Sequence, residues 1–480
     1  MALNVEVALL SGRSAVVCVP ADSAALSCMR LAQKELGIHL DCLLTSSGKV
    51  LEPRTSLTAC GVCEMETLTA HVRNHKLMAN GDENFGAFCS ISPGGCVVTA
   101  GDDAYGGNSH EIFQRLQDVE QTQASGAAFA AVRSDGSVVT WGHQQLGGDS
   151  SEVQDQLYDV LQIQGSYGAF AAIRADGSVV TWGREVHGGD SSSVQEHLHD
   201  VQQVQASKSA FAALRSDGSV VTWGYGLGDA IAPEVRPQRV RAIQACHDAF
   251  AGICFDGSVV TWGHQERGGD SSAVQHQLKR VEKIQASANA FAAICADGSV
   301  ATWGDERYGG NSSAVQPLLY DVQQIQASDG AFAAIRSDGC VVTWGNEADG
   351  GNSSAVAQQL HNVVQIQAAT SAFAAIRADG SVITWGNPGH GGDSTAVHEQ
   401  LQSVQHVQAT MDAFAAIRSD GSVVSWGCAE HGGNSSAVQH QLGNVTDVQG
   451  STGAFAAICS DGSVVLWGAR QHRGDTTMTQ

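Results

Sequence analysis

The sequence is short of basic residues and of long apolar runs, and each shortage narrows what the protein can do. Lys and Arg number 26 against 49 Asp and Glu, which leaves a formal net charge of −23. Nucleic acids and anionic membranes need basic patches on their partners, so this charge argues against both. No stretch approaches the roughly 18 apolar residues of a membrane-spanning helix, and the N-terminal residues lack the basic start and apolar core of a signal peptide. We therefore expect a soluble protein.

Paired cysteines and frequent prolines are missing as well. The thirteen cysteines are odd in number and irregular in position, which does not fit a disulfide framework. The lone C-x-x-C of Cys60 and Cys63 has no second pair, so we interpret it as two strand-flanking cysteines and not as a metal or redox site. These features predict a reducing compartment, the cytoplasm or the nucleus. Two of the seven prolines, Pro233 and Pro237, predict an extended segment within 225–238, because proline removes a helix donor.

Catalytic constellations are not apparent in the sequence. Histidines follow Trp-Gly pairs or fall in expected short helices, and none recurs at ligand spacing beside a cysteine or a carboxylate. The serines are turn and capping residues and not G-x-S-x-G nucleophiles. We therefore expect no enzyme activity, no cofactor and no metal site.

What the sequence has in abundance is one repeat. A Phe recurs ten times at steps of 41 residues, with a single step of 39. Each tryptophan of the chain lies twelve residues after one of these Phe residues: Trp141, Trp182, Trp223, Trp262, Trp303, Trp344, Trp385, Trp426 and Trp467. In the first copy Ala100 stands where the Trp belongs. A fixed period of this length is typical of repeat architectures, in which each copy is one supersecondary unit.

Each copy reads as a β-hairpin, as in "AFAAIRADGSVVTWG" at 169–183. Asp176-Gly177 suits a two-residue turn, which would place Ala171 opposite Trp182 and leave Phe170 on the other face. Both faces are apolar, so neighbouring units must cover the sheet on both sides. We expect every tryptophan to be buried between adjacent units as a structural residue.

The remainder of each copy adds a third strand and a short helix. The strand precedes the hairpin, as "VQQVQAS" does at 201–207. The helix follows Gly-Gly, and Ser272 with Gln275 forms a capping-box pattern that predicts about two helical turns. The boundaries are a linker and first repeat strand at 74–87, the array at 88–468, and a C-terminal tail at 469–480.

Residues 1–73 contain none of the repeat and read as two strands, a helix and two further strands. Leu3, Val5 and Val7 alternate as a half-buried strand requires, and Ala25 and Leu36 lie on the apolar face of the helix. The segment "SSGKVLEPRTSLTACGVCEMETLTAHV" resembles a ubiquitin-like β-grasp domain. Thr45 and His71 stand where that resemblance would place central apolar recognition residues.

The repeats resemble RCC1-type β-propeller repeats, and "DGSVVTWG" is the most specific part of the match. The whole chain is thereby identified with the HERC/RCC1-type superfamily. The expected fold is mainly β: a small α+β ubiquitin-like domain followed by about ten units of three strands and a short helix, arranged as a propeller-like toroid. An open β-solenoid or superhelix is the alternative.

One polar position recurs inside the first strand of nine units. It is occupied by glutamine, as in Gln164, Gln205, Gln285 and Gln326. A buried amide must be hydrogen-bonded. We interpret these residues as structural ties between neighbouring units; a ring of amides that lines a pore and holds a ligand is the alternative.

Variation between copies predicts the binding surface. The loops after Trp-Gly and the tips between the first and second strands differ from unit to unit, and chain direction places both sets at one rim. Loops on a rigid scaffold are where binding evolves. The candidate residues are His143, Arg184, His187, Lys208, His247, His264, Arg267, Arg307, Tyr308, Glu347, His390, Met411 and His431.

The expected function is a non-enzymatic scaffold or adaptor that binds a protein partner through this rim and connects to the ubiquitin system. By family analogy alone, one alternative is a guanine-nucleotide exchange factor for a small Ran-like GTPase. A second alternative is a ligase-associated subunit without a catalytic domain, because HERC-type ubiquitin ligases contain RCC1-like rings.

Overall fold

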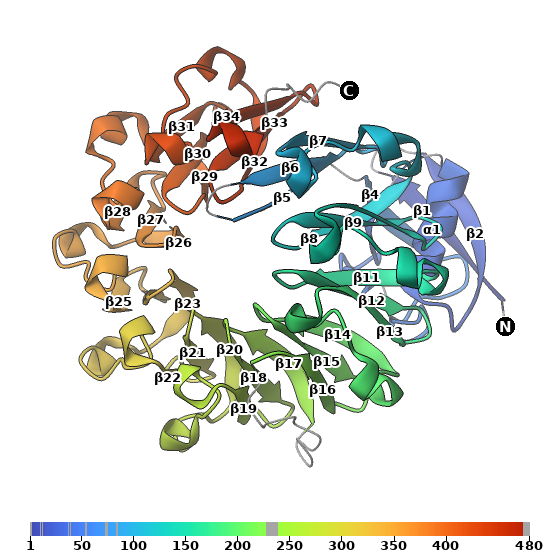
Figure 1. Ribbon diagram of the computed structural model, residues 1–480, viewed down its shortest axis with the longest axis horizontal. Helices are drawn as coiled ribbons and strands as arrows, with labels where there is room; N and C mark the ends of the chain where they lie inside the picture. Colours follow the sequence, from blue (N-terminus) through green and yellow to red (C-terminus); the bar gives the residue numbers. More distant parts are fainter. Residues whose placement is uncertain are drawn as a thin grey trace.

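The computed structural model describes residues 2–9, 11, 13–36, 38, 40–52, 55–72, 75–82, 85–226 and 239–473. The extended segment predicted around Pro233 and Pro237 lies outside the described residues. The chain forms a small N-terminal domain followed by ten separate three-stranded sheets, and these sheets follow one another around a central opening (Figure 1).

The N-terminal domain has the predicted order of two strands, a helix and two strands. Its elements are β1 (Ala2–Leu9), β2 (Ser14–Pro20), α1 (Ala25–Leu36), β3 (Leu40–Leu44) and β4 (Thr67–Val72). The sheet order is β2-β1-β4-β3, with β1 parallel to β4 and the other pairs antiparallel. Alternation along β1 buries Val5 and Val7 against Ala32 and Leu36 of α1, because successive strand residues point to opposite faces.

Ten repeat units of three antiparallel strands each follow. Units 1 to 5 comprise β5 (Lys76–Gly81), β6 (Gly86–Ile91) and β7 (Val97–Gly101); β8 (Val119–Ala124), β9 (Ala128–Arg133) and β10 (Val138–Gly142); β11 (Val160–Gly165), β12 (Ala169–Arg174) and β13 (Val179–Gly183); β14 (Val201–Ala206), β15 (Ala210–Arg215) and β16 (Val220–Gly224); β17 (Val240–Ala245), β18 (Ala249–Cys254) and β19 (Val259–Gly263).

Units 6 to 10 comprise β20 (Val281–Ala286), β21 (Ala290–Cys295) and β22 (Val300–Gly304); β23 (Val322–Ala327), β24 (Ala331–Arg336) and β25 (Val341–Gly345); β26 (Val363–Ala368), β27 (Ala372–Arg377) and β28 (Val382–Gly386); β29 (Val404–Ala409), β30 (Ala413–Arg418) and β31 (Val423–Gly427); β32 (Val445–Gly450), β33 (Ala454–Cys459) and β34 (Val464–Gly468). The chain then enters α2 (Arg470–Arg473). The first strand of every unit lies innermost, around the opening (Figure 1).

The hairpin turn differs from the two-residue turn that the sequence predicted. Gly177 N donates to Arg174 O at 2.9 Å, and Arg174 N donates to Ser178 O at 2.9 Å. Gly177 has a φ of 80°, in the left-handed region that suits glycine. The loop is therefore three residues long, a turn that ends in a left-handed glycine bulge.

This longer turn shifts the predicted register by one residue and corrects the assignment of faces. Phe170 pairs with Trp182, and Ala171 pairs with Thr181 instead of with Trp182. Directly opposed residues share a sheet face, so Phe and Trp lie together. Their rings stack with centroids 5.3 Å apart.

Neighbouring sheets pack face to face, as the two apolar faces predicted. In unit 3, Phe170 and Trp182 form one cluster with Ala130 and Val132 of unit 2. All nine tryptophans are buried, with exposed fractions of 3% to 6%, which confirms the structural interpretation. In eight of them the indole Nε1 donates to a glycine carbonyl of the preceding unit, as Trp182 does to Gly147 at 3.0 Å.

The units form the propeller-like toroid that the repeat predicts. Leu77 and Phe88 of unit 1 pack against Ala454, Ala456 and Ile458 of unit 10, which brings the ends of the array together (Figure 1). No described sheet combines strands of two units. Side-chain packing and loop contacts therefore hold the ring, as they would also hold the open superhelix.

The short helices after Trp-Gly are present as 3-10 helices. They are η1 (Asp103–Tyr105), η2 (His110–Arg115), η3 (Gln144–Leu146), η4 (Ser151–Gln156), η5 (Glu185–His187), η6 (Ser192–His197), η7 (Gln265–Arg267), η8 (Ser272–Val274), η9 (Glu306–Tyr308), η10 (Gln316–Leu318), η11 (Glu347–Asp349), η12 (Ala357–Gln359), η13 (Pro388–His390), η14 (Thr395–Gln400), η15 (Ala429–His431) and η16 (Gln439–Gln441).

The predicted capping box is wrong. Ser271, and not Ser272, is the N-cap residue of η8, and its side chain does not cap the helix. The Ser272 amide instead donates to Asp270 Oδ1 at 2.8 Å. The side-chain Nε2 of Gln275 donates to the Val259 carbonyl of β19 at 3.0 Å. This bond joins the helix to the third strand of its own unit.

Candidate functional site

The tips between the first and second strands are joined from unit to unit by backbone hydrogen bonds. One amide of each tip donates to the equivalent carbonyl of the next unit, with N–O distances of 2.8 to 3.2 Å. The bonds run in order through Gly126, Tyr167, Lys208, His247, Ala288, Asp329, Thr370, Met411 and Thr452. Because only backbone atoms make these bonds, the side chains at the tips are free to differ.

The loops after Trp-Gly meet these tips, as chain direction predicted. The Ser166 hydroxyl donates to the His187 carbonyl at 2.8 Å, and the Tyr167 and His187 rings meet edge-on with centroids 5.3 Å apart. Arg267 forms an ion pair with Asp248 of the unit 5 tip. We name the tips together with these loops the variable rim.

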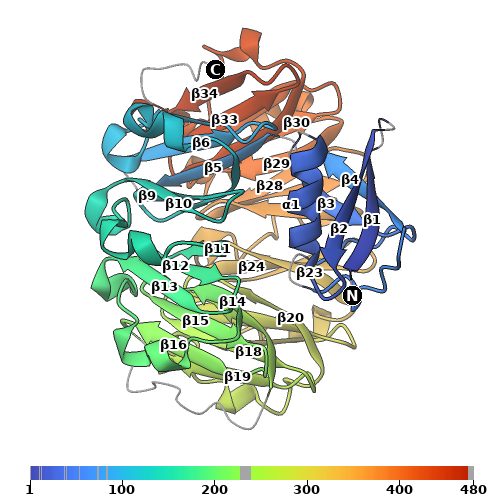
Figure 2. The same ribbon diagram turned by 90° about the vertical axis from the view of Figure 1, so that its right-hand side faces the viewer.

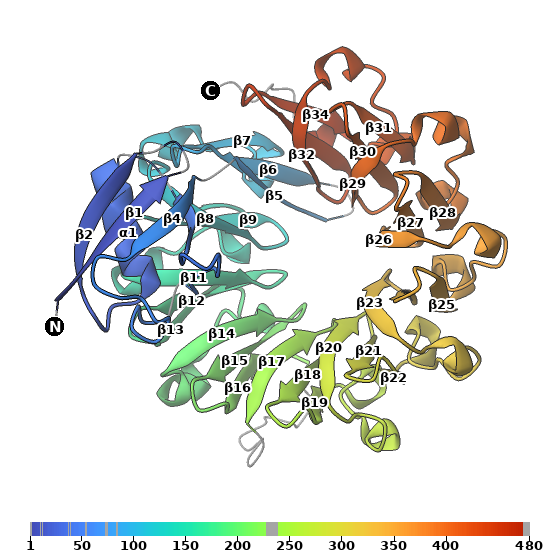
Figure 3. The same ribbon diagram turned by 180° about the vertical axis from the view of Figure 1, so that it is seen from behind.

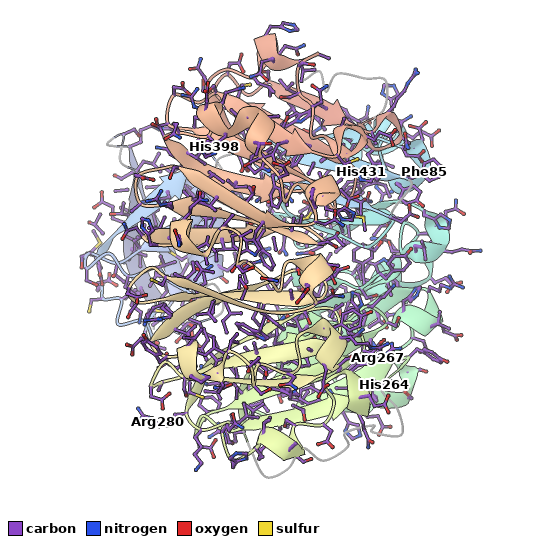
Figure 4. The ribbon with its side chains drawn as sticks, turned by 90° about the vertical axis from the view of Figure 1, so that its left-hand side faces the viewer. Phe85, His264, Arg267, Arg280, His398 and His431 are labelled. Atoms are coloured by element: carbon purple, nitrogen blue, oxygen red, sulfur yellow. The ribbon has the colours of Figure 1, made fainter. Side chains whose placement is uncertain are left out.

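The structure brings all the predicted rim residues to this surface. Lys208, His247 and Met411 lie at tips. The others lie in the short helices after Trp-Gly or directly before them: His143, Arg184, His187, His264, Arg267, Arg307, Tyr308, Glu347, His390 and His431. In Figure 4 Phe85, His264, Arg267 and His431 lie toward one side of the ring, and Arg280 lies toward the other.

A funnel of about 560 Å³ opens at the centre of the variable rim. Small residues at the ends of the first strands form its wall, and tip residues of units 4 to 10 form its mouth, Lys208, His247, Asp329 and Met411 among them. Burial raises the pKa of Asp329 and lowers the pKa of His247. The surroundings of the funnel therefore favour the neutral form of both groups.

Exposed aromatic side chains gather on the variable rim in units 1 to 4. Phe85 is 43% exposed and stacks near Tyr105 with centroids 5.8 Å apart. Tyr167 is 37% exposed, and Lys208 Nζ lies 5.6 Å from the centre of its ring. Tyr225 follows at 72% exposure. Exposed aromatics of this kind are enriched at protein interfaces.

Charged side chains replace the aromatics farther along the rim. Asp412 at the unit 9 tip lies between His390 of unit 8 and His431 of unit 9, with Nδ1–Oδ distances of 2.7 and 2.6 Å. Asp349 accepts a hydrogen bond from the Ser371 hydroxyl at 2.8 Å. The rim therefore presents an aromatic sector and a sector rich in carboxylates and histidines.

The opposite rim is uniform, because each Asp-Gly turn repeats the same bonds. Asp176 Oδ1 accepts from the Ser178 amide at 2.9 Å and from its hydroxyl at 2.6 Å. These bonds hold the pKa of Asp176 below its usual value. The residue before the first strand has positive φ in eight units, and Arg280 holds this position in unit 6 with a φ of 52°.

The N-terminal domain lies on this uniform rim, over units 1 to 3 (Figures 2 and 3). Arg30 of α1 donates to the Glu120 carboxylate of β8 at 3.1 and 3.3 Å, and Gln33 donates to it at 3.1 Å. The side chains of Glu120 and Arg30 are 10% and 24% exposed. The outer face of the sheet, where His71 is exposed, points away from this contact.

The recurring glutamines line the central opening and do not tie one unit to the next, which corrects the first interpretation. The Nε2 atoms of Gln164, Gln205 and Gln285 donate to the carbonyl of the following residue in their own strand, at 3.2 to 3.4 Å. Gln285 and Gln326 line a hollow of about 380 Å³ along the first strands. Backbone atoms of the tips, and not the side-chain amides of the glutamines, form the hydrogen bonds between units.

Among the residues that the structure describes, no group of three or more His, Cys, Asp or Glu side chains is placed to hold a metal ion. Within the same residues, no helix is long and apolar enough to cross a membrane. All thirteen cysteines lie within the described residues and outside any disulfide, with Cys63 exposed and Cys60 beside the core of the N-terminal domain.

Several rim residues escaped sequence reasoning. Phe85, Tyr105 and Tyr167 form much of the aromatic sector, and Asp329 and Asp412 hold tip positions. The usable signal for Phe85, Tyr167, Asp329 and Asp412 was their place at the tips, and Tyr105 holds the position five residues after the Trp position of its unit. That position holds His390 and His431, and in unit 10 it holds His472.

Comparisons with known proteins give remote similarities. No protein-family model and no curated protein matches the sequence. Prp20p of Saccharomyces cerevisiae is 15% identical, with 80% of this chain and 91% of that chain covered and a TM-score of 0.40. The designed Ika8 protein is 16% identical, covering 64% and 96%, with a TM-score of 0.31.

The UBL domain of Plasmodium falciparum Dsk2 is 23% identical over 15% of this chain and 97% of that chain, with a TM-score of 0.14. These values carry no argument about what this chain does. The propeller-like repeat fold rests on the strand pairing and unit packing described above.

Proposed function

We propose that this protein is a non-enzymatic scaffold or adaptor that binds a protein partner through the variable rim. The observation that carries the proposal is the variation of the loops and tips on one rim of a ring whose sheets, buried tryptophans and Asp-Gly turns repeat. A selective pressure for stability alone acts on every unit alike. A surface that differs in every unit fits recognition of one asymmetric partner.

The construction of the rim supports this function. The tips are held by the chain of backbone bonds, so their side chains lose little freedom on binding. The aromatic sector supplies residues of the kind that anchor interfaces. The carboxylates and histidines beside it supply charge complementarity and partner selection.

We propose that the N-terminal domain is a second, ubiquitin-like interaction module that links the scaffold to the ubiquitin system, in the cytoplasm or the nucleus. Its helix faces the ring through Arg30 and Gln33, so its outer sheet face is the surface left for a partner. Thr45 and His71 make that face more polar than the resemblance implies.

Affinity purification with the full chain tests the scaffold function. The rim variant combines Arg184→Glu, Lys208→Glu and Glu347→Lys, three exposed residues in different units. The control variant combines Glu282→Lys and Gln405→Lys, which are exposed at the starts of β20 and β29, away from the tips. A partner retained by the control and lost by the rim variant supports the proposal; equal retention by both contradicts it.

Two assays separate the alternatives. If the full chain accelerates nucleotide release from a Ran-like GTPase, the exchange-factor function replaces the scaffold function. Co-purification of ligase or proteasome subunits that depends on the N-terminal domain assigns the ligase-associated function.

A further inference from the structure

The ring has ten seams between units, and the seam that closes the ring lacks the tryptophan that the other nine contain. In the seam between units 6 and 7, Phe332 and Trp344 stack with centroids 5.2 Å apart, and Trp344 Nε1 donates to the Gly309 carbonyl of unit 6 at 3.1 Å. In the seam that closes the ring, unit 1 supplies Phe88 opposite Ala100. The indole, its stacking and its hydrogen bond are therefore missing there.

The apolar contact across the closing seam is correspondingly small. Its buried members are Leu77, Phe88, Ala454, Ala456 and Ile458. The seam between units 6 and 7 buries both aromatic rings together with Ile294, Val300, Leu319, Val322 and Ile325, among others. Apolar burial is the main favourable term in such packing, so the closing seam is the weaker of the two.

Strand pairing does not reinforce the closing seam. Each sheet is built from one contiguous unit, and within the described residues no ladder joins unit 10 to unit 1. The C-terminal α2 instead crosses the seam and contacts β6, β7 and β34. Opening at this seam would break side-chain contacts and leave all ten sheets intact.

His472 is the side chain by which α2 fills the seam. It is 1% exposed and lies five residues after Trp467, the position that His390 and His431 hold in their units. A Cβ atom at Gly86 of unit 1 would lie 2.5 Å from its Nδ1, and one at Gly453 of unit 10 would lie 3.0 Å from its Nε2. The imidazole is therefore wedged between glycines of the two units.

The surroundings of His472 disfavour a charged imidazole. Within the described residues its Nδ1 has no hydrogen-bond partner, whereas His431 Nδ1 lies 2.6 Å from Asp412 Oδ2 in a hydrogen bond. Burial, together with a smaller effect of the nearby His431, lowers the pKa of His472 to about 4. Asp82 and Asp102 raise this pKa without offsetting the effect of burial.

We propose that the ring opens at the seam between units 10 and 1, and that protonation of His472 releases α2 and unlatches this seam. An open seam exposes His472 to water, where the imidazole accepts a proton at its ordinary pKa. The closed ring binds that proton only at lower pH, so closure loses stability as pH falls from about 6.5 toward about 4. Above about pH 6.5 His472 is neutral in both the open and the closed seam, so its protonation no longer lowers the stability of the closed ring.

Hydrogen exchange of the full chain, corrected for intrinsic rates, tests the pH-dependent opening of the seam between units 10 and 1. Between pH 7.5 and pH 5.0 the protection of the Ala469 and His472 amides, which donate to Gly453 O and Ala469 O in the closed seam, should fall by about thirtyfold relative to β24, the ratio that pKa values of 6.5 and about 4 give. Strand β24 is the internal control because its seam with unit 6 retains both rings. In His472→Gln the relative protection should become independent of pH, whereas His431→Gln should keep the pH dependence.

Two results overturn the proposal. The first is protection of the Ala469 and His472 amides that stays constant relative to β24 between the two pH values, which would show that α2 is not released. The second is a pH dependence that survives His472→Gln, which would assign it to another group. A His472→Gln variant that exchanges faster at every pH still supports the packing role of the His472 ring, provided its exchange is insensitive to pH. None of these outcomes depends on the partner proposed for the variable rim.

Discussion

Replacing Glu120 with Gln should release the N-terminal domain from the ring. The carboxylate accepts three hydrogen bonds, two from Arg30 and one from Gln33. A hydrogen bond to a charged group contributes about 1.5–3 kcal/mol, and exposed ion pairs contribute about 0–1 kcal/mol. Because Glu120 is 10% and Arg30 24% exposed, we expect a loss of about 2 kcal/mol, or about thirtyfold in the ratio of docked to released domain.

Methyl NMR of valine-labelled full-length protein measures this release. A docked domain tumbles with the whole chain, whereas a released domain gives narrow signals from Val5 and Val17. Glu282→Gln is the matched control, because Glu282 holds the same strand position in unit 6 and β20 lies away from the N-terminal domain in the ring (Figure 1). Unchanged linewidths in Glu120→Gln, or equal narrowing in both variants, would refute the role of this contact. In a double-mutant cycle with Arg30→Met, the two changes should be strongly non-additive.

Two further predictions concern the stability of the ring. Trp344→Ala should lower the free energy of unfolding by about 3–5 kcal/mol, because the indole is 4% exposed and loses its stack and its bond to Gly309; Trp344→Phe should lose less, and an unchanged midpoint in denaturant would contradict the burial argument. Arg280→Asn should raise stability by about 1 kcal/mol, since the left-handed conformation at φ 52° strains Arg more than Asn. The reverse change, Asn362→Arg at the same position of unit 8, should lower stability by a similar amount. A lowered midpoint for Arg280→Asn, or a raised midpoint for Asn362→Arg, would refute the strain.

Much of the fold could be predicted because a similar pattern of apolar and turn residues recurs in ten copies of the repeat. The pairing of an apolar strand with an Asp-Gly turn and a second apolar strand identifies the hairpin in any one copy. Apolar residues on both faces then require neighbours on both sides, and this requirement places Trp182 and its equivalents in the core. The variable rim followed from chain direction alone, because strand ends that are joined by a loop must lie at the same edge.

The details that failed depend on contacts between residues that are far apart in the sequence, within one copy or between two. Asp176-Gly177 suits a two-residue and a three-residue loop equally well, and packing of the next unit decides between them. A Cβ atom at Gly177 would lie 2.9 Å from the Cα atom of Asp200 in that unit. Gln275 fits a capping box locally, but the Val259 carbonyl of a neighbouring strand binds its amide instead. Glu120 shares its residue type with Glu282 at the same position of unit 6, and only the structure shows Arg30 beside Glu120.

The contiguity of each sheet has a consequence for how such an array can change during evolution. No strand is borrowed from a neighbouring unit in the described sheets, so duplication or loss of one 41-residue segment would leave every hydrogen-bonded ladder intact. The seams repeat the same Phe–Trp contact, and a new copy would therefore find a matching surface on both sides. The number of seams would change, so each seam would have to turn the chain of units by a different angle to close the ring. A gene that gains or loses whole copies in this way can alter the size and the order of the loops on its rim without redesigning the core.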